Sequence, residues 1–157
     1  MATKRQNYRH LPHTWEIGRM RYDLYRRSHR RLNKALRHGF WLEAIAIEEA
    51  IIADRLESLL YALGTTDSMA TLNQSRNKLW KHHRDLLPHD INEKLTKWWS
   101  GRNFALHMIV KYGNDIEYSW TYRLQKAREC ARSGDLLVSE VSKFVSRELR
   151  KIKRNNV

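Results

Sequence analysis

The chain has few of the residues that interrupt helices or cross-link a fold: its 157 residues include six Gly, two Pro and one Cys. A single cysteine, Cys130, excludes an internal disulfide and favours a reducing compartment such as the cytoplasm. No apolar run approaches the ~20 residues of a membrane-spanning helix, so we expect no membrane partner. Residues 1–6 contain no apolar stretch typical of a secretory signal.

The scarcity of Gly and Pro, with many Ala, Leu, Glu, Lys and Arg residues, predicts an all-α fold. We expect an antiparallel bundle of about five helices, preceded by a flexible basic leader over residues 1–14. Residues 15–157 then form one helical domain whose last helix is basic. Apolar spacing and breaks at Gly39, Gly64, Pro88, Gly101 and Ser133–Asp135 place helical segments at about 15–37, 40–63, 69–84, 90–101, 103–112, 116–132 and 136–152.

The segment 40–63 carries the strongest helical pattern. Its apolar residues keep one helical face and predict a buried central helix. They are Ile45, Ile52, Leu56, Leu59 and Leu63. Asp54 and Arg55 lie in the middle of this helix, where burial requires polar partners.

The formal net charge of +13 indicates a polyanionic partner, and nucleic acid is the class that we expect. The densest basic cluster predicts an RNA contact, although a solvated helix face is the alternative. It consists of Arg26, Arg27, Arg30 and Arg31. His82 and His83 have no carboxylate or cysteine at ligand spacing, so we expect no metal site. The chain also has no Gly-rich phosphate loop, and we expect no cofactor.

An arginine followed five residues later by a histidine occurs three times, whereas 19 Arg and 8 His in 157 residues give about one by chance. One copy lies in the basic leader, and Pro88 interrupts the copy that ends at His89. The third, Arg102 with His107, opens a strongly apolar stretch. Its context distinguishes it from the other two.

Asn103, His107 and Lys111 lie at positions i, i+4 and i+8 and form one polar stripe on this apolar helix. Arg102 is about 140° round the helix from His107, but its long side chain can reach back. Arginine grips phosphate with a planar fork of donors, and histidine transfers protons near neutral pH. These residue types suit a phosphodiester better than a metal ion. The alternative is a buried helix with one satisfied histidine.

The Arg102-Asn103-x-x-x-His107 motif after a Trp-containing helix resembles the HEPN superfamily of small helical nucleotide-binding domains. The segment 45–60 is similar to the long second helix of such domains, which often carries an acidic residue toward the pocket. On this resemblance Asp54 or Glu48 is the supporting acid. A competing copy, Arg76-Asn77-x-x-x-x-His82, also fits the motif's spacing.

The resemblance implies a metal-independent endoribonuclease, commonly a prokaryotic toxin or antiviral effector. Arg102, Asn103 and His107 are then the catalytic residues, with Lys111 in support. The implied assembly is a homodimer in which two motifs face each other, and a cognate antitoxin or other defence protein is a possible partner. Two alternatives stay open: a non-catalytic adaptor of this fold, and an unrelated helical nucleic-acid-binding protein that uses segment 19–38.

Overall fold

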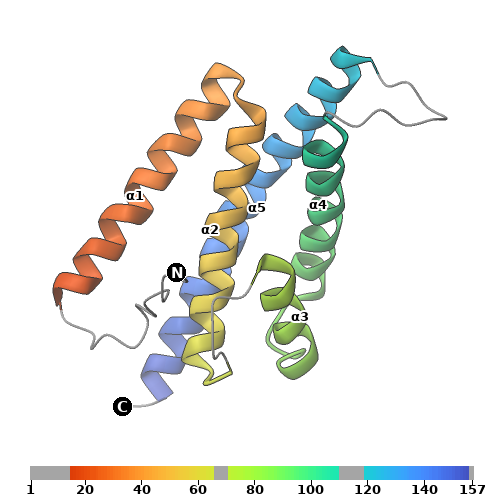
Figure 1. The fold of residues 1–157 in the computed structure, drawn as a ribbon. Coiled ribbons are helices and arrows are strands. Elements are labelled where there is room, and N and C mark those ends of the chain that lie inside the picture. Colours follow the sequence, from red (N-terminus) through yellow and green to blue (C-terminus); the bar gives the residue numbers. More distant parts are fainter. Residues whose placement is uncertain (1–14, 66–70, 110–118, 156–157) are drawn as a thin grey trace, which may run out of the picture.

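The structure is a computed structural model that describes residues 15–65, 71–109 and 119–155. These ranges contain five α-helices and no strand, which confirms the expected all-α class (Figure 1). The helices are α1 Trp15–His38, α2 Trp41–Ala62, α3 Leu72–His82, α4 His89–Met108 and α5 Trp120–Asn155. The predicted leader and Lys111 lie outside the described residues.

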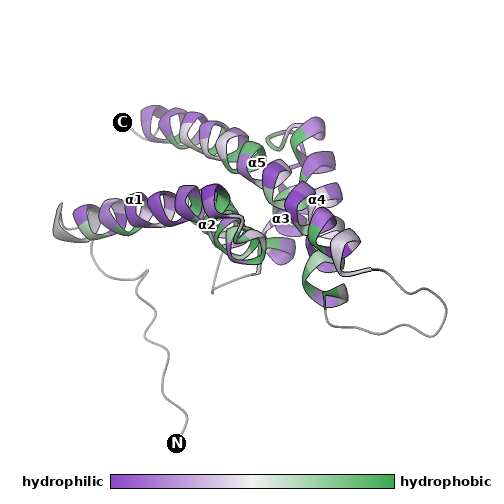
Figure 2. Ribbon diagram, turned by 90° about the horizontal axis from the view of Figure 1, so that it is seen from above, coloured by the Kyte–Doolittle hydropathy of each residue, from purple (hydrophilic) through white to green (hydrophobic). Residues whose placement is uncertain are grey.

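Helices α2 and α5 form the centre of the bundle. Helix α1 packs on α2, α4 packs on α5, and the short α3 packs on α2 (Figure 1). Consecutive long helices run in opposite directions, as predicted, whereas the central pair α2 and α5 runs in the same direction. A 2.9 Å hydrogen bond between the hydroxyls of Tyr25 and Ser142 joins α1 to α5. Hydrophilic residues prevail along α1 and α5 (Figure 2).

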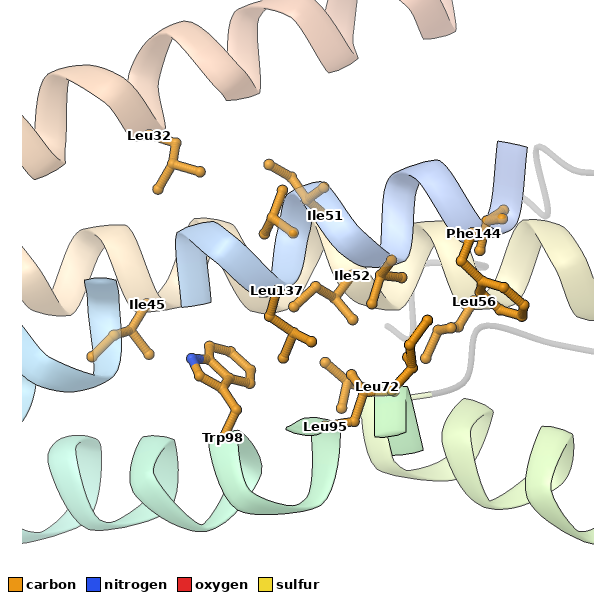
Figure 3. Close-up of a cluster of buried hydrophobic side chains, with 14 of the residues drawn as sticks. Leu32, Ile45, Ile51, Ile52, Leu56, Leu72, Leu95, Trp98, Leu137 and Phe144 are labelled. Atoms are coloured by element: carbon orange, nitrogen blue, oxygen red, sulfur yellow. The ribbon is translucent and has the colours of Figure 1, made fainter. Parts of the chain in front are cut away.

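The core centres on the apolar face of α2, where the helical spacing correctly predicted the buried residues. Ile45, Ile52, Leu56 and Leu59 are fully buried, and Leu63 is partly buried against them. Their partners come from the other four helices (Figure 3). Those drawn and labelled are Leu32, Leu72, Leu95, Trp98, Leu137 and Phe144.

Two glycines end helices as the sequence predicts. Gly39 (φ 74°) separates α1 from α2, and Gly64 (φ 68°) follows α2. Both have the positive φ that glycine adopts without the steric penalty of a Cβ atom. After the break at Gly39, α2 runs back along α1, and Trp41 is the first residue of α2.

Two other predicted breaks are wrong. Helix α4 continues through Gly101, and α5 continues through Ser133–Asp135 to form one helix of 36 residues. The reason at Gly134 is close packing: a Cβ atom there would lie 2.6 Å from Nε1 of Trp98 and closer still to Oε2 of Glu48. Glycine is therefore needed at this point for the approach of α2 and α4 to α5, and it does not end the helix.

Among the described residues, no helix combines the length and the apolar character needed to cross a membrane.

Candidate active site

Arg102 lies on the side of α4 that faces α2. Its Nε donates to Oε2 of Glu49 at 2.7 Å, and its Nη2 is 2.5 Å from the same oxygen. Its Nη1 donates to Oδ1 of Asn103 at 2.9 Å. The guanidinium carbon also lies 5.0 Å from the ring centroid of Trp99. Three neighbours therefore fix the guanidinium at the edge between the two helices.

The Arg102–Glu49 pair is mostly shielded from solvent, with side-chain exposures of 19% and 21%. At this depth a paired arginine and carboxylate hold each other more firmly than a surface pair does. A guanidinium has five N–H donors, and the contacts to Glu49 and Asn103 use three of them. Two donors are left for another acceptor, although Glu49 already balances the positive charge.

His107 is exposed and lies one helical turn beyond Asn103. We call Arg102, Asn103 and His107, which lie within six consecutive residues of α4, the α4 edge; Arg102 faces α2, and His107 lies about 140° round the helix from it. Within the described part of the chain, no hydrogen bond joins His107 to Arg102. The structure brings Arg102 and Asn103 into contact and leaves the imidazole of His107 open to solvent.

The acid beside Arg102 is Glu49, whereas the sequence pointed to Asp54 or Glu48. Asp54 lies near α1, with Oδ1 3.9 Å from Nη2 of Arg21. Consecutive residues on a helix point about 100° apart, so Glu48 and Glu49 enter different interfaces. The pair Glu48-Glu49 was visible in the sequence, but only the packing of α2 decides which carboxylate meets α4.

Glu48 is fully buried between α2, α4 and α5, and neither of its carboxylate oxygens has a hydrogen-bond partner among the described residues. Burial, and to a smaller extent the nearby charge of Asp135, raises the pKa of Glu48 to about 9. This carboxyl is therefore neutral near pH 7 and belongs to the core. Burial beside Glu48 also raises the pKa of the Cys130 thiol to about 12, so Cys130 is not a ready nucleophile.

The predicted RNA-binding arginines of α1 are all exposed, but they do not form one patch. Arg27 and Arg31 line a pocket of about 660 Å³ between α1 and α2, and Arg31 pairs there with Glu43. Arg26 and Arg30 are outside this pocket and form no ion pair with any residue that the structure describes. The helical twist therefore divides the cluster between two faces.

The competing motif on α3 forms a different polar cluster. Arg76 donates to Oδ1 of Asn73 at 3.1 Å and to Oδ1 of Asn77 at 2.7 Å, and it also donates to Thr96 of α4. His82 is exposed in the last turn of α3. Arg76 thus connects α3 to α4 through neutral partners.

Comparison with protein-family models gives no match, and comparisons with curated proteins and with solved structures give no significant match. The described residues contain no group of three or more His, Cys, Asp or Glu side chains that could hold a metal ion. The geometry of the α4 edge is therefore the basis for assigning a function.

Proposed function

We propose that this chain is a metal-independent endoribonuclease of the HEPN type and that the α4 edge is its active site. One observation carries the proposal. Arg102 is held by Glu49, Asn103 and Trp99, while an exposed histidine, His107, follows one turn after Asn103. A fixed guanidinium and an accessible imidazole from the same stretch of helix are residue types suited to phosphodiester cleavage.

In the proposed reaction, His107 accepts the proton of an RNA 2'-hydroxyl, and the 2'-oxygen attacks the adjacent phosphorus. The bond from phosphorus to the 5'-oxygen breaks, and that oxygen takes a proton from a general acid, the protonated His107 of a second copy of the chain. The products are a 2',3'-cyclic phosphate and a 5'-hydroxyl. The free donors of Arg102 stabilise the negative charge that builds on the phosphate oxygens. Asn103 keeps the guanidinium in position through its 2.9 Å hydrogen bond.

Glu49 has two opposing effects in this mechanism. Its carboxylate orients Arg102, but it also neutralises the charge that a phosphate would meet. Glu49→Gln keeps the shape and a hydrogen-bond acceptor while removing the negative charge. We therefore expect this variant to bind RNA more tightly than the wild type, whereas Glu49→Ala should loosen Arg102 and lower the cleavage rate.

We further propose that the enzyme acts as a homodimer. Each chain supplies one histidine at the α4 edge, while the reaction needs both a base and an acid. A second copy related by a two-fold axis would supply the second histidine. The resemblance to HEPN toxins and antiviral effectors makes an antitoxin or another defence protein the expected protein partner.

The test is RNA cleavage by the full chain in EDTA, comparing the wild type with Arg102→Ala and His107→Ala. Each variant should lose on the order of 10²–10⁴-fold in rate while keeping its helicity. Arg102→Lys should restore little activity, because lysine keeps the charge but lacks the planar fork. His89→Ala is the matched control, since His89 is an exposed histidine of the same helix. Cleavage that survives both alanine substitutions, or that stops on chelation, contradicts the proposal.

A second candidate function is a non-catalytic RNA-binding adaptor. The observation that favours it is the ion pair itself, because Glu49 neutralises Arg102 while Arg26 and Arg30 stay unpaired among the described residues. This candidate predicts salt-dependent RNA binding that Arg102→Ala leaves unchanged, with no cleavage. Arg26→Ala and Arg30→Ala should each weaken that binding.

A further inference from the structure

One end of the bundle gathers aromatic rings where α1 turns into α2. The rings of His38 and Phe40 stack with their centroids 5.9 Å apart, and Phe40 is 53% exposed. Trp41, the first residue of α2, packs partly against the core and leaves part of its indole accessible. The positive φ of Gly39 creates this turn, and a Cβ atom at this position would lie 3.5 Å from Cζ2 of Trp41.

Trp41 forms one wall of a pocket of about 550 Å³ between the start of α2 and the first third of α5. Arg128 contributes a second wall, with its guanidinium carbon 5.8 Å from the centroid of the Trp41 ring. The remaining lining residues all come from one side of α5. They are Thr121, Leu124, Gln125, Glu129 and Arg132.

The charge of this pocket is positive and uncompensated. Arg128 and Arg132 are exposed, and neither forms an ion pair with a carboxylate among the residues that the structure describes. The acid of the lining, Glu129, is engaged by Lys126, whose Nζ lies 2.8 Å from Oε2. By contrast, Arg102 is paired with Glu49. Two guanidinium groups without a carboxylate partner among the described residues therefore flank a partly accessible indole, and that of Arg128 lies over its ring.

We propose that this pocket binds one unstacked nucleotide of a single-stranded nucleic acid. The base stacks on Trp41, and the neighbouring phosphates contact Arg128 and Arg132. A ring face with adjacent cations fits this ligand, because a nucleotide offers both an aromatic plane and a negative charge. A duplex keeps its bases stacked on each other and cannot present one to Trp41.

The pocket is distinct from the α4 edge. Glu49 follows Trp41 by eight residues, which corresponds to about 12 Å along α2, and it faces α4 whereas Trp41 faces α5. The inference rests on the proposed function only in taking RNA as the natural strand. Binding at the pocket needs neither His107 nor a 2'-hydroxyl.

The test is fluorescence anisotropy with labelled single-stranded DNA and RNA of about 12 nucleotides and with a duplex, using the full chain carrying His107→Ala. Trp41→Leu should weaken binding of both single strands by about 5- to 100-fold and leave duplex binding unchanged. Trp41→Phe should keep most of the affinity, because it keeps a ring. Arg128→Ala and Arg132→Ala should each lower the salt dependence, d log K/d log[salt], by about 0.7 in magnitude, whereas Trp41→Leu should not change it.

The chain contains a matched control. Arg84, in the turn after α3, lies over Trp80 of α3 with its guanidinium carbon 4.9 Å from the ring centroid, so the two residues form the same kind of pair away from the Trp41 pocket. Trp80→Leu and Arg84→Ala should leave single-strand binding nearly unchanged. Equal losses at both pairs, unchanged single-strand affinity in both Trp41→Leu and Arg128→Ala, or equal competition by polyglutamate would overturn the proposal. Because the assay requires no cleavage, these outcomes are separate from the failure of the proposed ribonuclease activity.

Discussion

The substitution Gly134→Ala probes the tightest packing in the bundle. The added Cβ atom would lie 2.6 Å from both Cδ of Glu48 and Nε1 of Trp98 and would overlap Oε2 of Glu48. Neither neighbour can move away easily. Glu48 is fully buried, and the Trp98 indole donates to the carbonyl oxygen of Cys130 at 3.1 Å. The clash should therefore force the central helices apart.

Overpacking of this kind costs about 3 kcal/mol when the neighbours are confined. Replacing glycine by alanine inside a helix stabilises the helix by about 1 kcal/mol. The net destabilisation is then about 2 kcal/mol, which corresponds to a fall in Tm of about 4–8 °C for a chain of this size. Thermal unfolding followed by circular dichroism measures it.

Gly101→Ala is the control, because Gly101 also lies inside a helix and its added Cβ would meet only Sγ of Cys130 at 3.8 Å. This variant should be more stable than the wild type by up to about 1 kcal/mol, because alanine has a higher helix propensity than glycine and its Cβ meets no clash here. Glu48→Ala should make Gly134→Ala less harmful, since it removes the group that overlaps the new Cβ. A Gly134→Ala protein as stable as the wild type would refute the packing argument.

Two further predictions concern the core carboxyl and the assembly. Because burial raises the pKa of folded Glu48 to about 9, the unfolded chain loses this proton first, from its ordinary value of 4.5. The wild-type protein should therefore become progressively less stable as the pH rises from 4.5 to about 9. In urea titrations, the free energy of unfolding of Glu48→Gln relative to that of the wild type should rise across the same pH window. Light scattering should return a dimer of the 18.9 kDa chain, and a monomer at micromolar concentration would contradict the composite site.

Much of the fold could be predicted because hydrophobic spacing and positive-φ glycines are local signals. The α2 face with Ile52 and Leu56 is buried as expected, and Gly39 and Gly64 end helices as expected. Gly134 is a residue whose role local sequence signals do not predict. In the sequence it looks like a helix terminator, yet it is required by a contact with residues 36 and 86 positions away.

The candidate site shows the same limit. The motif of Arg102, Asn103 and His107 was found from the sequence, and the contact between Arg102 and Asn103 is local. The carboxylate that pairs with Arg102 was not predicted, because Glu48 and Glu49 differ only in the direction in which each points from α2. Glu48 points into the core and is fully buried, whereas Glu49 points toward α4 and pairs with Arg102.

The most direct measurement of the central claim identifies the chemical ends of RNA fragments formed by the wild-type chain in EDTA. We predict 2',3'-cyclic phosphate and 5'-hydroxyl ends, because the proposed base at His107 activates the 2'-hydroxyl. A substrate with a 2'-deoxy sugar at the cleaved position should stay intact. Fragments with 3'-hydroxyl and 5'-phosphate ends, or fragments formed equally well by His107→Ala, would contradict the assignment of the α4 edge as a ribonuclease site.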